Sequence, residues 1–234
     1  LYWLGMFISL IGTWIQTVAQ SWLVFQLTNS ALLLGVVGFL GSIPVFIFSL
    51  FGGLLADRMN KRNILIVTQS AFMLLAFVLA VLTQLELITP SQIMLIAVLN
   101  GIVLSFDAPA RQAVVVELVG KVNLFNAITL NSVAFNSSRV IGPSIAGILV
   151  ATIGMSGCFY INGISFLPLV IALFFIKTNK DFSNSKNNTA LKDIKDGLAF
   201  IKNNRLILTL IVMVGVVSLF GVAYLILMPI FAND

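Results

Sequence analysis

Few residues in this sequence are of the types that carry out bond-making chemistry, and the missing types exclude several classes of catalytic and metal site. The chain has 234 residues, with no histidine and one cysteine, Cys158. A serine–histidine–aspartate site, a cysteine–histidine site and an intramolecular disulfide therefore cannot form within it, nor can a metal site of histidine and cysteine ligands. Cys158 lies in an apolar stretch, where packing is its expected role. We expect a protein that is not an enzyme and holds no metal and no cofactor.

The charged residues gather at a few places, and the densest group is the run GLLADRMNKR. Its glycine and its charged residues are Gly53, Asp57, Arg58, Lys61 and Arg62. A glycine lets neighbouring helices approach closely, and a short charged segment can form ion pairs across helix ends. The residues alone leave two roles open: a gate built from ion pairs, or charges that only fix the topology of the chain.

A second charged group is the run FDAPARQA, which follows a later apolar stretch. Asp107 and Arg111 stand four residues apart in it. Side chains at this spacing meet on one face of a helix. We therefore expect the two residues to pair if the helix continues past Pro109.

Arg139 is the most costly residue in the sequence, because it lies inside an apolar stretch. It follows Leu124 by fifteen residues, which is about 22 Å along a helix. A charge at that depth in a membrane costs at least ~2.5 kcal/mol, so it should face protein or water. Ser132 and Asn136 share its helix face. Its partner is expected to be a group of carbonyl oxygens, an anionic substrate, or an acid beyond the end of this sequence.

The first apolar stretch carries a stripe of uncharged polar residues. They are Ser9, Thr13, Gln16 and Gln20, at spacings of four, three and four. This spacing places all of them on one helix face. Such a stripe can line a cavity or form hydrogen bonds to neighbouring helices.

The elements that carry these groups follow from composition. Of the residues, 59% are hydrophobic and 9% charged, and the mean hydropathy is +1.09. A soluble domain is about one-quarter charged, so lipid must be the solvent for most of this surface. Each span needs roughly 20 apolar residues and must be a helix. We expect seven spans: Leu1–Leu27, Ala31–Leu55, Ile64–Leu85, Ser91–Ser105 (continuing toward Arg111), Leu124–Ile153, Cys158–Ile176 and Leu206–Phe231.

The basic residues predict how these spans are oriented. Twelve of the thirteen lysine and arginine residues fall in three gaps, residues 57–63, 107–123 and 177–205. Basic loops remain on the cytoplasmic side of a membrane, which places these three gaps there. The opposite gaps, near 86–90 and 154–157, hold none. This distribution favours a multi-pass protein of the bacterial inner (plasma) membrane and excludes a nucleic-acid-binding surface.

The spans predict three parts: residues 1–176 form a six-helix transmembrane bundle, 177–205 a cytoplasmic connector and 206–234 a further transmembrane helix. Residues 177–188 have the composition of a flexible linker. Leu191, Ile194, Leu198 and Ile201 follow at amphipathic helical spacing. Six spans, a connector and a seventh span are typical of a two-half transporter. We expect both ends to be cut and the second half of the same polypeptide to be missing.

The run from Gly53 to Arg62 resembles the loop signature of the major facilitator superfamily, G-x-x-x-D-R/K-x-G-R-R/K. Asn60 replaces the second glycine, a mild departure because asparagine tolerates a left-handed backbone. The resemblance implies a twelve-helix transporter in which this loop latches the cytoplasmic gate. It also implies that Asp57 meets a helix of the second half and that Lys61 pairs with Asp107.

Five further segments resemble members of the superfamily. The run from Asp107 to Gln112 is similar to the D-x-P-x-R-Q variant of enterobactin exporter-like efflux permeases, and Ala97 stands where the general R-x-x-Q-G motif has its arginine. Gly12-Thr13-Trp14, Thr28–Ala31 and Ala127–Ser132 are similar to that subgroup too. Gly142, Pro143 and Gly147 resemble the Gly-Pro motif of antiporters, which implies a bent helix, close packing and export.

The resemblance implies a secondary active efflux permease that exports a small siderophore-like or drug-like molecule by alternating access. Helices 1 and 4 face the centre in this superfamily, so we expect the first-span stripe and Asn100 to line the cavity, together with Ser132, Asn136 and Arg139. No phosphate-binding loop motif is present, so protons are the expected driving ion. Their carrier is Asp107 or lies beyond Asp234. The alternatives are a seven-helix receptor and a membrane-embedded enzyme.

Overall fold

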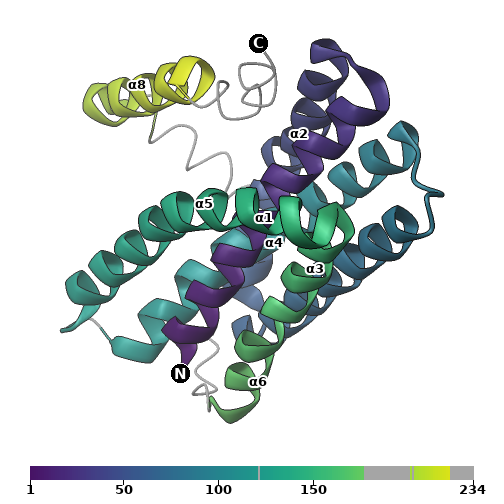
Figure 1. Cartoon of the computed structure of the whole chain (residues 1–234). Helices are drawn as coiled ribbons and strands as arrows, with labels where there is room; N and C mark the ends of the chain where they lie inside the picture. The colour runs from purple at the N-terminus through teal and green to yellow at the C-terminus, as the bar shows by residue number, and fades with distance from the viewer. Residues whose placement is uncertain (121, 177–200, 202, 222–234) are drawn as a thin grey trace.

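The computed structural model describes residues 1–120, 122–176, 201 and 203–221, and Figure 1 shows how they are arranged. The described residues are helical, without a strand. The helices are α1 (Tyr2–Thr28), α2 (Ala31–Arg58), α3 (Lys61–Gln84), α4 (Pro90–Val119), α5 (Leu124–Ser165), α6 (Leu167–Phe175) and α8 (Arg205–Gly221). The expected connector, residues 177–205, and the last part of the seventh span lie almost entirely outside the described residues.

Polar residues with helix-capping side chains set where the first helices begin. Ser30 accepts a hydrogen bond from the backbone N–H of Leu33 at the start of α2. Thr89 and Gln92 form a reciprocal capping box at the start of α4, directly before Pro90. These contacts satisfy backbone N–H groups that a helix leaves without partners at its first turn. The first four expected spans therefore each correspond to one helix, and α4 extends to Val119.

The fifth and sixth expected spans meet inside α5. Gly154 has φ of +74° and ψ of 179° within this segment, so the backbone is not helical there. Glycine adopts a positive φ without strain because it has no Cβ. The chain changes direction at this point and descends through the rest of α5 into α6, in green in Figure 1.

Helices distant in sequence form the main contacts of the bundle. α1 packs along α5, α2 packs along α4, and α3 lies against both α4 and α5. Backbone contact is closest between α2 and α4, where a Cβ added at Gly101 would collide with the carbonyl oxygen of Gly41. A Cβ at Gly52 would collide with the carbonyl oxygen of Ser105. Small residues of this kind let membrane helices come together.

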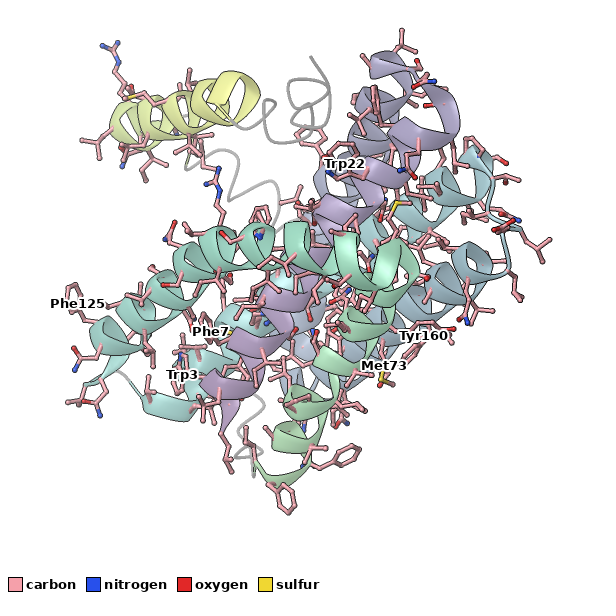
Figure 2. All side chains as sticks on the ribbon, viewed as in Figure 1. Trp3, Phe7, Trp22, Met73, Phe125 and Tyr160 are labelled. Carbon is pink, nitrogen blue, oxygen red and sulfur yellow. The ribbon has the colours of Figure 1, made fainter. Side chains whose placement is uncertain are left out.

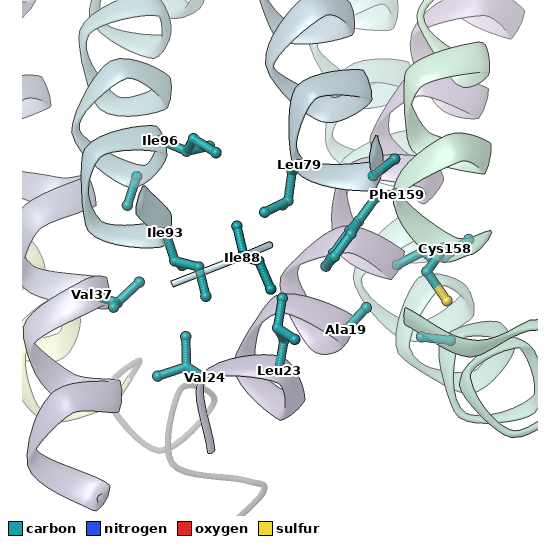
Figure 3. Packing of buried hydrophobic residues seen from close by; sticks show 14 of the residues in the cluster. Ala19, Leu23, Val24, Val37, Leu79, Ile88, Ile93, Ile96, Cys158 and Phe159 are labelled. Atoms are coloured by element: carbon teal, nitrogen blue, oxygen red, sulfur yellow. The ribbon is translucent and has the colours of Figure 1, made fainter. Parts of the chain in front are cut away.

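The buried core is divided into two apolar clusters. One contains Leu23, Leu79, Ile93 and Phe159 and is drawn in Figure 3. The other contains Met6, Leu65, Val114 and Leu173. Along α1, α3, α4 and the α5–α6 segment, buried polar residues fall between the two clusters: Ser9, Thr68, Gln69, Ser105, Asp107, Asn162 and Ser165. The bundle therefore has a buried polar layer between two apolar ends.

The outer surface is apolar. Phe46 is 87% exposed and Phe125, which points away from the bundle in Figure 2, is 81% exposed. Five helical segments of the described chain are long and apolar enough to cross a membrane, and the last of them, Leu124–Phe175, contains the break at Gly154. Lipid is the solvent that such a surface requires. The prediction of an all-α membrane protein is confirmed.

Candidate functional site

A cavity of about 560 Å³ opens between α1, α2 and α4. Its polar wall is formed by Ser9, Thr13, Gln16, Thr17, Gln20, Ser21, Ser42, Asn100, Asp107, Arg111, Gln112 and Asn162. Phe72, Phe135 and Phe166 contribute aromatic rings to the same wall. The described wall therefore combines uncharged hydrogen-bonding groups, apolar surface and one oppositely charged pair.

The structure brings five of the eight expected cavity residues to this wall: Ser9, Thr13, Gln16, Gln20 and Asn100. The hydroxyl groups of Thr13 and Thr17 donate to carbonyl oxygens one turn earlier, at 2.8 and 2.9 Å. Asn162 Nδ2 donates to Gln16 Oε1 at 2.6 Å, which fixes the Gln16 amide against α5. The stripe on α1 thus both lines the cavity and forms hydrogen bonds within the protein, the two roles that the sequence left open.

The other three expected residues lie on α5 away from this cavity. Ser132 and Asn136 are exposed, and Asn136 Nδ2 donates to the carbonyl oxygen of Ser132 at 2.8 Å. The guanidinium carbon of Arg139 lies 5.9 Å from the ring centroid of Trp14 on α1. A guanidinium over an indole face is a favourable cation–π contact. The sequence did not indicate this partner, because the contact joins residues 125 positions apart.

The three residues of the Gly-Pro motif on α5 differ in how closely a neighbouring helix packs against them. A Cβ at Gly142 would collide with the side chain of Trp14, so this glycine lets α5 pack against α1. Gly147 has no atom within 4 Å of its Cβ position among the described residues. The backbone at Pro143 stays within the helix, and the non-helical residue of α5 is Gly154. Close packing was therefore expected at two glycines and occurs at one.

Asp107 is the centre of the buried polar layer. It is 1% exposed and accepts four hydrogen bonds. Thr68 Oγ1 and Gln69 Nε2 donate to Oδ1 at 2.7 and 2.6 Å. Arg111 Nε and a terminal nitrogen of the same guanidinium donate to Oδ2 at 3.1 and 2.8 Å. Both oxygens of the carboxylate therefore have two donors, and its charge is balanced by the adjacent guanidinium.

The ion pairs confirm one pairing and correct another. Asp107 pairs with Arg111 because α4 continues unbroken through Pro109. The expected pair between Lys61 and Asp107 is wrong, since Lys61 Nζ contacts Glu117 Oε1. Thr68 is the α3 residue at the level of Asp107, and Lys61 lies seven residues before it, about 10 Å along the helix axis. The antiparallel α4 must continue well past Asp107 to reach Lys61, and Glu117 lies ten residues further on, about 15 Å along the axis, within reach of the long lysine side chain.

The charged loop between α2 and α3 is organised by Asn60. Its side chain accepts from the backbone N–H groups of Arg62 and Asn63 at 3.0 and 3.4 Å. The φ angle of Asn60 is −66°, so the left-handed backbone that we expected at this position is not present. Asparagine serves here as the N-cap of α3. Arg62 donates to the carbonyl oxygen of Phe174 at 3.0 Å and thereby ties the loop to the end of α6.

The remaining loop residues are more open. Asp57 and Arg58 are exposed. The close helix approach expected at Gly53 occurs instead at Gly52, while Gly53 has no described atom within 4 Å of its Cβ position. Successive residues of a helix point in different directions around its axis, so Gly52 faces α4 and Gly53 does not. The loop therefore presents Asp57 and Arg58 at one end of the bundle, with Lys61 and Arg62 holding it to α4 and α6.

Sequence reasoning missed Thr68 and Gln69, which hold Asp107. A signal was available: with Ser70 they form a run of three polar residues inside a largely apolar span. The described residues contain no group of three or more histidine, cysteine, aspartate or glutamate side chains that could hold a metal ion.

A family model matches the chain along its whole length, and several known transporters match most of it. The family model described as transmembrane secretion effector matches residues 1–234. The chain is 29% identical over 237 residues to the staphyloferrin A transporter of Staphylococcus aureus, an alignment that covers 97% of this chain and 57% of that protein. It is 30% identical over 212 residues to the uncharacterized MFS-type transporter YfiS of Bacillus subtilis, covering 86% and 48%. It is 29% identical over 155 residues to the enterobactin exporter EntS of Shigella boydii, covering 65% and 37%.

The chain spans about half the length of the first two of these relatives. The resemblance inferred from the charged loop and from the run at Asp107 is confirmed, including its subgroup. The family match covers every helix and both charged motifs described above. The chain belongs to the major facilitator superfamily of membrane transporters, within its transmembrane secretion effector family.

Proposed function

We propose that this chain is the first half, with one helix of the second half, of a secondary active efflux permease that exports a small molecule by alternating access. The cavity between α1, α2 and α4 is the observation that carries the proposal. Two relatives are named for siderophores, one as a transporter and one as an exporter, which supports a siderophore-like substrate and, for the second, export. The receptor and enzyme alternatives find no support among these relatives.

The wall of the cavity supports an amphipathic substrate. A volume of about 560 Å³ lies in the range of small-molecule sites, which combine apolar lining with a few polar groups. Gln20 and Asn100 offer amide hydrogen bonds, while Phe72 and Phe135 offer aromatic contact. We propose that Ser132, Asn136 and Arg139 on the exposed face of α5 meet the second half of the polypeptide and extend this wall.

The loop from Gly53 to Arg62 is proposed as the cytoplasmic latch. Its own half supplies two anchors, the pair of Lys61 with Glu117 and the bond from Arg62 to α6. Asp57 is exposed and so is available to a helix of the second half. Together with the distribution of basic residues, this supports a cytoplasmic position for residues 57–63, 120–123 and 177–205. The expected loop 107–123 is shorter than the sequence indicated, because residues 107–119 continue α4 and Asp107 lies in the buried polar layer.

Protons are proposed as the coupling ion. A carboxyl group that takes up a proton can accept fewer hydrogen bonds than a carboxylate, because the protonated oxygen becomes a donor. In this structure each carboxylate oxygen of Asp107 already accepts two hydrogen bonds. Proton uptake by Asp107 would thus require release of Arg111 or of the α3 side chains. The carrier is therefore Asp107 with such a rearrangement, or an acid beyond Asp234.

Export from cells tests the proposal. The full-length protein is produced in bacteria that lack their own exporters, and efflux of enterobactin, staphyloferrin A and ethidium is measured. We expect export of at least one of these compounds and its loss on collapse of the proton gradient. Asp57→Asn should abolish export at normal membrane abundance, whereas Glu86→Gln, which changes an exposed carboxylate in the turn between α3 and α4, should leave it unchanged. Full export by Asp57→Asn would remove the latch.

A further inference from the structure

Gln69 is a fully buried polar side chain that does not line the cavity. It is 0% exposed and lies behind the wall formed by α1 and α4. Its amide nitrogen donates to Asp107 on α4 at 2.6 Å. Its amide oxygen accepts from the hydroxyl of Ser9 on α1 at 3.5 Å. One side chain of α3 thus connects the two helices that carry most of the polar cavity wall.

The orientation of this amide follows from the chemistry of its neighbours. The carboxylate of Asp107, paired with Arg111, can only accept hydrogen bonds. The nitrogen of Gln69 must therefore face α4, which leaves its oxygen for α1. On that side the hydroxyl of Ser9 is the donor, in the longer contact of 3.5 Å. A leucine at position 69 could make neither contact, and an ionised glutamate could not donate to an ionised Asp107, so a glutamine amide fits both neighbours.

Both residues that Gln69 contacts, Ser9 and Asp107, line the cavity. Arg111, the partner of Asp107, belongs to the same wall. Thr68 supports only Asp107, so Gln69 is the α3 residue that reaches both α1 and α4. A displacement of α1 relative to α4 would stretch one of its two hydrogen bonds.

We propose that Gln69 is a positioning residue for transport: it holds the Asp107–Arg111 pair in the cavity wall and couples that pair to α1. It acts through these neighbours and does not contact the substrate. The inference rests on the proposed export function, because a cavity wall needs positioning only if a substrate uses it. The loss of its bond to a charged partner should lower the export rate by about tenfold or more.

The test combines a transport readout with one that is independent of transport. Gln69→Leu removes both hydrogen bonds. Gln69→Glu places a second carboxylate beside Asp107, and the double variant Gln69→Glu/Asp107→Asn exchanges amide and carboxylate between the two positions. The control is Gln84→Leu, on the same helix, where the amide accepts from Tyr160 at 2.7 Å outside the cavity. Export and the thermal unfolding midpoint of the purified full-length protein are measured for each.

Gln69→Leu and Gln69→Glu should each reduce export about tenfold or more at normal abundance, while Gln84→Leu should not. The exchange variant should recover both export and unfolding midpoint relative to Gln69→Glu and to Asp107→Asn alone. Export by Gln69→Leu at the wild-type rate, or an exchange variant that shows only the summed defects of its two substitutions, would overturn the role of Gln69. If the wild type exports none of the compounds, the function fails, and the unfolding midpoints still decide whether the amide–carboxylate pairing holds.

Discussion

Removing one member of the buried pair of Asp107 and Arg111 should destabilise the protein far more than removing one member of the pair of Lys61 and Glu117. Arg111→Met keeps an apolar side chain of similar length but removes the guanidinium. Asp107 is 1% exposed and would keep its two donors from α3 while losing both donors on Oδ2 and its counter-charge. Breaking a buried ion pair from one side costs roughly 3–5 kcal/mol. Because the Arg111 side chain is 17% exposed, we expect the lower end, about 3 kcal/mol.

Removing both members should cost much less than removing one. In Asp107→Asn/Arg111→Met no charge remains buried, and Thr68 retains an amide oxygen as its acceptor. Replacing a complete buried pair by neutral groups is often close to neutral, so we expect a loss of about 1 kcal/mol or less. For Lys61→Met the expected loss is also below about 1 kcal/mol, since pairs near the surface contribute little. The Lys61 and Glu117 side chains are 19% and 30% exposed.

Thermal unfolding of the purified full-length protein in detergent measures these differences. The single variants at Asp107 and Arg111, the double variant and Lys61→Met form one series. The expected order of midpoints places Arg111→Met lowest, with the double variant near the wild type. Equal midpoints for Arg111→Met and Lys61→Met would refute the reasoning, because they would mean that burial does not distinguish the two pairs.

Two further predictions concern the packing and the caps of the helices. Gly52→Ala should lower membrane abundance, because the new Cβ would collide with the carbonyl oxygen of Ser105. Gly53→Ala, whose Cβ would have no described atom within 4 Å, should accumulate normally in an immunoblot of membranes. Equal abundance of the two variants would contradict the contact between α2 and α4. Asn60→Ala should cost about 1 kcal/mol and Asn60→Gly only a few tenths in the same unfolding assay, and an unchanged midpoint for Asn60→Ala would remove its role as the cap of α3.

The sequence predicted what depends on one helix at a time. The pairing of Asp107 with Arg111 follows from a four-residue spacing, and the stripe from Ser9 to Gln20 follows from periodicity along α1. The part of the cavity wall that α1 contributes could therefore be predicted without knowing which helices pack against α1. The break near Gly154 was indicated by the change from one apolar stretch to the next.

What depends on the register between helices was missed. Lys61 meets Glu117 because α4 continues to Val119, beyond the end of the apolar stretch from which its span was predicted. The residue types after that stretch do not show where the helix ends. Gly52, not Gly53, touches α4 because the rotation of α2 is set by packing. Trp14 covers Arg139 because α1 lies along α5, a contact that no local pattern encodes.

Thiol labelling of the cavity wall tests the account most directly. In a cysteine-free background of the full-length protein that includes Cys158→Ala, Thr13→Cys places one thiol in the wall, and Phe46→Cys places one on the apolar outer surface, where Phe46 is 87% exposed. A water-soluble methanethiosulfonate reagent should modify the first thiol and block export, more slowly when the exported compound is present, and should leave the second unmodified. Rapid labelling of the Phe46→Cys thiol, with a Thr13→Cys thiol that does not react, would contradict both the cavity and the lipid-facing surface.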